Sequence, residues 1–192
     1  MRRLILAAFA PLALAGLSGC SDKSSADKTA AQADAKSSSG TLASAVSDAP
    51  GMTTVAGALK SSGLATVFDG NAPYTLLAPD DDAFGALGEA GAALKTPENA
   101  AAMAEVLRAH TLPGFVTRAD IDAALASAKG KPVKMKTMGG AEVSFARAGD
   151  TVSVTAADGS TAKLDGEPIA ASNGVALPID AVLKKVPAAA GT

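Results

Sequence analysis

The chain has 192 residues, with 17 basic and 19 acidic side chains, one histidine, one cysteine and no tryptophan. From Thr41 onward there are 12 basic and 16 acidic residues, and no basic patch is interleaved with aromatic residues, which argues against nucleic acid as a partner. A metal site of His and Cys ligands and an intramolecular disulfide are both excluded, because each needs more of these residues than the chain has.

The N-terminus carries the signals of export. Met1-Arg2-Arg3, a short apolar run and Leu17-Ser18-Gly19 predict a signal peptide over residues 1–19, too short to remain as a membrane-spanning helix. The small residues before Cys20 resemble a bacterial lipoprotein signal, which implies cleavage before Cys20 and lipid on its sulfur. Residues 20–40 lack large apolar side chains and predict a flexible tether.

The resemblance also implies a location. A lipid on Cys20 would anchor the chain to the bacterial cell envelope, and Ser21 after the cysteine favours the outer membrane, facing the periplasm or the cell surface. Residues 41–188 are then expected to form one domain, followed by a flexible tail over 189–192.

The first half of the domain predicts helices around one strand. Apolar residues at helical spacing and capping signals predict helices over 52–62, 80–87, 97–109 and 119–128. Tyr74 to Ala78 is an apolar run of strand length that ends at Pro79. We expect Thr96 to cap the third helix and Thr117 to cap the fourth through its hydroxyl.

The second half predicts an antiparallel meander. Alternating apolar and polar residues between glycine turns predict strands over 132–136, 141–146, 151–155 and 161–164, and the strands 169–171 and 175–179 are expected to finish the sheet. Pro178 should lie at an edge or a bulge, because proline cannot donate to a ladder. No helices separate the later strands, so the fold class is α+β.

Three segments, in order, resemble the signatures of the fasciclin-like domain. They are Thr75–Phe84, Leu107–Gly114 and Asn173–Leu183. The resemblance implies a wedge-shaped β-sandwich with several helices packed on it. It also implies adhesion or protein interaction as the function, without enzymatic activity and without a cofactor.

The candidate site residues lie within these segments. His110 occupies the family's Tyr-His position, where the histidine is mainly structural; here Ala109 replaces the tyrosine, and Leu177 replaces a polar or aromatic residue. A structural role, a partner contact and catalysis all remain open for His110. Asp80, Asn173 and Asp180 are candidate interaction or structural residues of the same motifs.

The three consecutive acids Asp80 to Asp82 suggest calcium or helix capping. They lack the spaced acids, the central glycine and the terminal glutamate of an EF-hand loop, so capping is the favoured interpretation and no metal is expected.

Three functions compete. The first is an envelope-anchored module that binds an envelope, matrix or cell-surface protein. The second is a carrier of a small apolar ligand, a lipid or a tetrapyrrole, with Met103, Met135 and Met138 lining its pocket. The third is a hydrolase built around His110, for which no Gly-x-Ser-x-Gly nucleophile motif is present.

Overall fold

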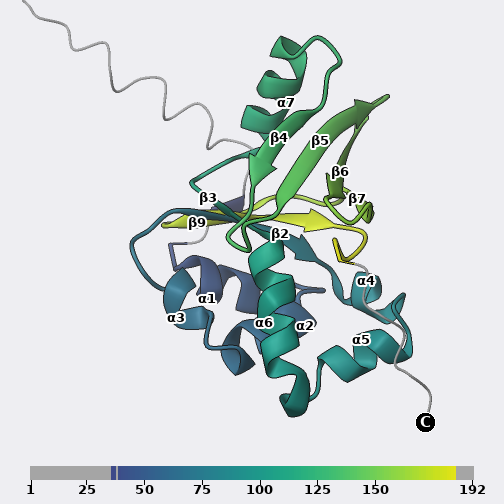
Figure 1. Ribbon diagram of the computed structural model, residues 1–192. Coiled ribbons are helices and arrows are strands. Elements are labelled where there is room, and N and C mark those ends of the chain that lie inside the picture. The colour runs from purple at the N-terminus through teal and green to yellow at the C-terminus, as the bar shows by residue number, and fades with distance from the viewer. Residues whose placement is uncertain (1–35, 38, 185–192) are drawn as a thin grey trace, which may run out of the picture.

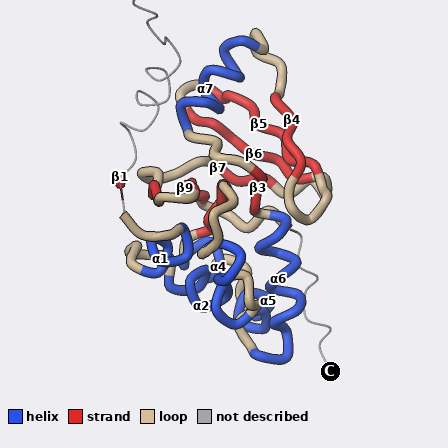
Figure 2. The backbone as a smooth tube through the Cα atoms, turned by 90° about the vertical axis from the view of Figure 1, so that its left-hand side faces the viewer, coloured by secondary structure: helices blue, strands red, loops and turns tan. Residues whose placement is uncertain are grey.

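A computed structural model describes residues 36–37 and 39–184. The predicted signal peptide, the lipidation site Cys20, most of the predicted tether and the 189–192 tail lie outside the described residues. The described chain forms three layers: helices, a five-stranded sheet, and a four-stranded sheet with one helix packed against it (Figures 1 and 2).

The five-stranded sheet forms the middle layer. Its strand order is β1-β8-β9-β2-β3, with bounds Lys36–Ser37, Ile169–Ala171, Gly174–Ile179, Tyr74–Pro79 and Thr111–Pro113. The central strands β2 and β9 run parallel, in register from Tyr74 opposite Gly174 to Pro79 opposite Ile179. The first and third motifs are therefore direct neighbours in the core.

Alternate residues of these two strands supply two separate cores. Leu76, Ala78 and Ala176 pack with the helices. Leu77 and Val175, with their neighbours on the same face, pack against the second sheet. Because both faces of the central strands are covered, they read as continuous apolar runs, as buried parallel strands do.

Six helices cover the outer face of this sheet. They are α1 (Leu42–Ser47), α2 (Thr53–Ser61), α3 (Ala65–Phe68), α4 (Asp81–Gly85), α5 (Glu89–Leu94) and α6 (Ala100–Ala109). A 3₁₀ turn, Pro97–Asn99, precedes α6, and the Thr96 side chain makes no capping hydrogen bond. The predicted Thr96 cap is therefore wrong, because the helix proper begins later, after Asn99.

The second sheet is the predicted antiparallel meander. Its strands are β4 (Val133–Lys136), β5 (Glu142–Ala148), β6 (Thr151–Ala156) and β7 (Thr161–Lys163). Helix α7 (Arg118–Ser127) packs on β5, and the Thr117–Asp120 capping box at its start confirms the predicted cap. These observations, with the first sheet and its helices, confirm the α+β fasciclin-like fold class.

The end of the chain departs from the prediction. Residues 169–171 and 175–179 do not finish the meander, because the chain crosses after β7 to the first sheet and forms β8 and β9 there. The continuous burial of β9 from Gly174 to Leu177, unlike the alternation in β5, suits a sheet covered on both faces.

Pro178 is likewise not in an edge strand. It lies in the central strand β9, beyond the end of β8. The Asn173 carbonyl accepts from Tyr74 of β2 and the Ile179 carbonyl from Asp80 just after β2, whereas the Pro178 carbonyl accepts from the Asp165 amide on the other side. The nitrogen of Pro178, which carries no hydrogen, thus faces away from β2. On that side β8 has already ended, so no ladder hydrogen bond from Pro178 is needed.

Candidate functional site

The first acid of the Asp80–Asp82 run is a helix cap. Asp80 is the N-cap of α4, and its Oδ1 accepts a hydrogen bond from the Ala83 amide at 2.6 Å. Asp82 lies in the first turn of the same helix, where negative charge is favourable. The capping interpretation therefore describes both residues.

Asp81 caps a different helix, α2. Its carboxylate accepts from the amides of Thr53 and Thr54, at 3.2 and 2.7 Å, and from the Thr53 hydroxyl at 2.7 Å. Burial alone would raise the pKa of Asp81, but the hydrogen bonds from the two threonines outweigh it and lower the pKa to about 2.

The sequence contained a signal for this contact. Met52 stands at the N-cap of α2 and has no side-chain acceptor, so the first amides of that helix need a partner from elsewhere. Asp81 supplies it, and the Asp81 amide in turn donates to the Gly51 carbonyl at 2.9 Å.

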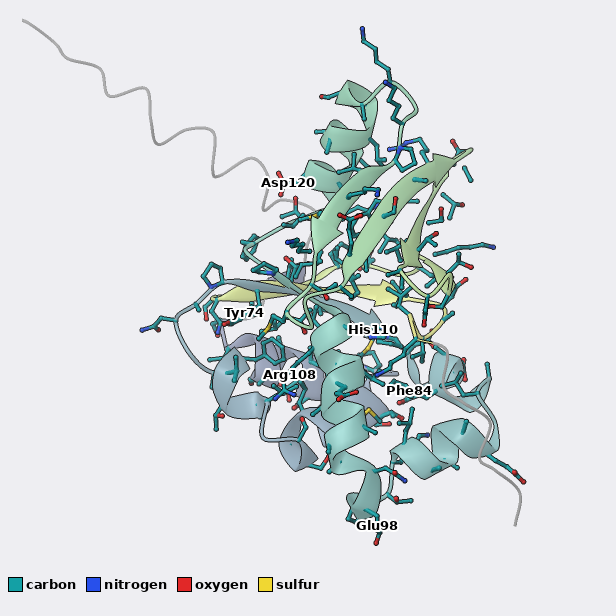
Figure 3. All side chains as sticks on the ribbon, viewed as in Figure 1. Tyr74, Phe84, Glu98, Arg108, His110 and Asp120 are labelled. Carbon is teal, nitrogen blue, oxygen red and sulfur yellow. The ribbon has the colours of Figure 1, made fainter. Side chains whose placement is uncertain are left out.

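His110 lies fully buried between α6 and the end of the described chain (Figure 3). Its Nδ1 lies 2.7 Å from the Val106 carbonyl, and its Nε2 accepts from the Leu183 amide at 2.8 Å. These partners define the neutral tautomer with hydrogen on Nδ1. Burial lowers the pKa of His110 to about 4, against the opposing effect of the Val106 carbonyl.

The end of α6 is completed by neighbouring backbone and side chains. The Thr111 hydroxyl donates to the Leu107 carbonyl at 2.7 Å, and the Gly139 amide donates to the Arg108 carbonyl at 3.0 Å. With His110 on Val106, the carbonyls of Val106, Leu107 and Arg108 in the last turn each have a partner. His110 is thus the C-cap of α6, with both ring nitrogens engaged by backbone.

Ala109 and Leu177, the two departures from the family pattern, lie in different surroundings. Ala109 lines a surface pocket of about 530 Å³ together with Met138 and Leu183. Leu177 is buried in β9 and faces the second sheet. Neither residue brings a polar group to the surface.

Asn173 joins three segments. Its Oδ1 accepts from the Leu42 amide at 2.7 Å, and its Nδ2 donates to the carbonyls of Phe68 and Gly70. Asp180 accepts from the Lys163 amide at 2.7 Å and so ties the end of β9 to β7. Asp80, His110, Asn173 and Asp180 are therefore distributed through the fold and do not form one cluster.

The three methionines of the carrier hypothesis are also separated. Met103 is buried in the helical core, Met135 packs against the core between the sheets, and Met138 lines the pocket beside Ala109. None of the pockets described here is lined by more than one of them. The structure does not bring these residues together as a single ligand cavity.

A surface groove, which the sequence did not reveal, opens beside the first motif. Its volume is about 760 Å³, and four segments line it: α1 with the α1–α2 turn, the β2–α4 junction, the β7–β8 connection with the start of β8, and β9. Its apolar walls are Ala45, Ala49, Pro50, Met52, Pro168, Ile169 and Pro178, and its acidic residues are Asp48, Asp80, Asp81, Asp82, Asp165 and Glu167.

Within residues 36–37 and 39–184, no three His, Cys, Asp or Glu side chains are grouped so that they could hold a metal ion. Over the same residues, every helix is too short or too polar to cross a bilayer.

Comparison with known proteins identifies the class of this fold. Residues 50–185 match the family model of the Fasciclin domain, so the chain belongs to the fasciclin domain family. Fasciclin domains are typically non-enzymatic modules associated with adhesion and protein interaction. The resemblance of the three motifs to this family is thereby confirmed.

Two particular relatives are similar to this chain. Protein sll1483 of Synechocystis sp. is 33% identical over 90 residues, which are 45% of this chain and 49% of that protein, so the match spans about half of each. The FAS1 domain pair of the insect cell adhesion molecule Fasciclin I shares the fold, with a TM-score of 0.50 and 18% identity over 76% of this chain and 44% of that chain.

Proposed function

We propose that this protein is a non-enzymatic fasciclin module, anchored by lipid to the bacterial envelope, that mediates cell adhesion or binds another envelope, matrix or cell-surface protein. The observation that carries the proposal is the match of residues 50–185 to a domain family associated with adhesion and protein interaction. The anchor rests on the sequence before the domain.

The internal use of the motif side chains supports a binding role over a catalytic one. His110 is fully buried, and both of its ring nitrogens are engaged by backbone groups. A general base must reach the proton that it abstracts, and His110 has no exposed face from which to do so. The acids Asp80 and Asp81 are engaged in helix capping.

The groove is the surface best suited to a contact. It combines apolar walls with carboxylates at its rim, and its volume of about 760 Å³ lies in the range of binding clefts, about 300–1,000 Å³. Its lining residues lie mostly in loops and at element ends, which the sheet and its helices position.

Lipidation at Cys20 would hold the domain at the envelope, and residues 20–40 would space it from the bilayer. Cys20→Ala should move the protein from the membrane fraction to the soluble fraction of the cell envelope. Ser21→Ala is the matched control and should leave the protein with the membrane. A Cys20→Ala protein that stays membrane-bound would refute the anchor.

The adhesive role is tested by deletion of residues 41–188 with the anchor and tether kept. We expect attachment of cells to surfaces, matrix or partner cells to fall severalfold, because the binding module is removed. The control is a full-length chain with the exposed pair Lys60→Glu and Lys95→Glu, which should attach normally. Unchanged attachment after the deletion would contradict the proposal.

A further inference from the structure

The groove is negatively charged as well as apolar. Asp48, Asp82, Asp165 and Glu167 are exposed at its rim, and Asp82 also serves the first turn of α4. Among the described residues that line the groove there is no lysine or arginine. A partner seated on the apolar walls would therefore gain from positive charge at its edge.

The opposite character is found at the turn between α7 and β4, here called the basic turn and defined as Lys129–Pro132. All four of its residues are exposed, and two of them are lysines. Lys134 and Lys136 follow on β4, where Lys134 is paired with Glu142 at 2.8 Å. Figures 1 and 3 show the α7–β4 connection at the upper end of the molecule.

The basic turn is held in one conformation. Lys129 and Gly130 both have positive φ, 51° and 83°, which ends α7 sharply. The Lys129 amide donates to the Ala126 carbonyl at 3.2 Å, and the Lys131 amide donates to the Ala128 carbonyl at 3.1 Å. A protrusion that is already ordered loses less conformational entropy when it binds.

We propose that the basic turn of one copy inserts into the groove of a second copy, with Lys129 and Lys131 against the acidic rim and Pro132 against the apolar walls. The charges are complementary: an exposed, positively charged turn meets a negatively charged groove. In Figure 1 the turn lies at the top of the domain, whereas α4, whose first residues line the groove, lies on the right below both sheets.

Because turn and groove are different patches, the contact is head-to-tail and leaves a free turn and a free groove at the ends of each pair. Copies anchored on one membrane, or on two facing ones, could join into chains. This inference rests on the proposed binding function and specifies one partner, a second copy of this chain.

The test is sedimentation of the purified full chain in detergent over a range of concentrations. At low ionic strength we expect concentration-dependent association, weakened at least tenfold in Kd at physiological salt, because the Debye length falls from about 30 Å at 0.01 M to about 8 Å at 0.15 M. A full chain that stays monomeric at every concentration at low salt would overturn the proposal.

Charge reversal on each side identifies the surfaces. K129E/K131E and D165K/E167K should each raise Kd more than tenfold, whereas K60E/K95E should leave it unchanged. An equimolar mixture of K129E/K131E with D165K/E167K should regain association, because the unchanged groove of the first variant can bind the unchanged turn of the second, and their two reversed surfaces also carry opposite charge. Association that persists in both variants, or a mixture that stays monomeric, would refute the pairing of these two surfaces.

Thermal unfolding of each variant is compared with that of the wild type to verify that it is folded. If K129E/K131E does not fold, K129Q/K131Q takes its place, and if D165K/E167K does not fold, D165N/E167N takes its place. The outcome is separable from the adhesion test. If the domain deletion abolishes attachment but the full chain does not self-associate, the proposed function is supported and this inference is wrong. If the full chain self-associates but the deletion leaves attachment unchanged, this inference is supported and the proposed function is wrong.

Discussion

The five-stranded sheet is covered on both faces, by helices on one side and by the second sheet on the other, whereas the four-stranded sheet alternates buried and partly exposed residues. The strands of the first and third motifs lie side by side at the centre of the five-stranded sheet. The motifs therefore mark the part of the molecule where close packing leaves least freedom, and the surfaces available for contact lie on the turns around it.

The largest difference between the two sheets should appear at glycines. A Cβ at Gly174 would lie far inside van der Waals distance of the Tyr74 carbonyl oxygen, so Gly174→Ala must displace β9 from β2 and should cost about 3 kcal/mol or more. Gly140, in the turn of the second sheet, has open space around it, and Gly140→Ala should cost only about 1–2 kcal/mol for its positive φ.

Urea unfolding of both glycine variants measures this difference. Equal losses of stability in the two variants would show that the close approach at Gly174 costs no more than a positive φ in an open turn, contrary to this prediction.

The next effect concerns His110 and pH. Its folded pKa of about 4 lies below the usual 6.5, so the unfolded state binds the proton more readily, and stability present above pH 6.5 is lost as pH falls towards 4. A shift of this size corresponds to about 3 kcal/mol. His110→Gln should be destabilised at pH 7 and should lose this pH dependence.

Free energies of unfolding measured between pH 7 and pH 4.5 test the role of His110. A wild-type stability that stays flat over this range would mean that the ring is accessible to protons in the folded state.

Asp81 should give a smaller effect in a different pH window. Asp81→Asn weakens the cap on α2 and should cost about 1–2 kcal/mol at pH 7. Because the folded pKa is lowered to about 2 from 3.8, the contribution of the carboxylate is present above pH 3.8 and is lost as pH falls through about 2.

Asp82→Asn is the matched control for Asp81, since Asp82 is exposed in the first turn of α4 and should cost less than about 1 kcal/mol. If the two variants have the same stability at pH 7, the link from Asp81 to α2 contributes nothing.

The smallest effect is expected in the basic turn. Lys129 is the non-glycine residue with positive φ among the described residues, and Lys129→Gly should raise stability by up to about 1 kcal/mol by removing that strain. Lys131→Gly, without such a φ, should give no gain. Thermal denaturation of the two variants distinguishes them, and a destabilised Lys129→Gly would show that the turn is unstrained.

Much of the fold followed from local patterns. The alternation in residues 132–164 predicted the meander, and the Thr117–Asp120 spacing predicted the cap of α7. The prediction that Thr96 caps a helix was wrong, because Pro97 begins a 3₁₀ turn before the α-helix. The prediction that residues 169–171 and 175–179 finish the meander was wrong, because strand pairing depends on which faces of a sheet are covered. The pattern of a single strand does not show which strand lies beside it.

The candidate site was less predictable. The sequence predicts Asp80 as a helix cap, because the amide that donates to it, that of Ala83, lies only three residues away. Asp81 instead accepts from the amide of Thr54, 27 residues earlier in the chain. The groove draws its walls from four segments that only the fold brings together.

The sequence by itself determined most local elements and the α+β class, because periodicity and turn residues are properties of neighbouring residues. The family followed from the resemblance of three motifs and the match to the family model. Only the tertiary structure decided that β2 lies beside β9, that His110 binds a backbone amide 73 residues away, and that a groove and a basic turn stand at separate places. Such contacts join distant segments through burial and hydrogen bonding, which become defined only when the whole chain has packed.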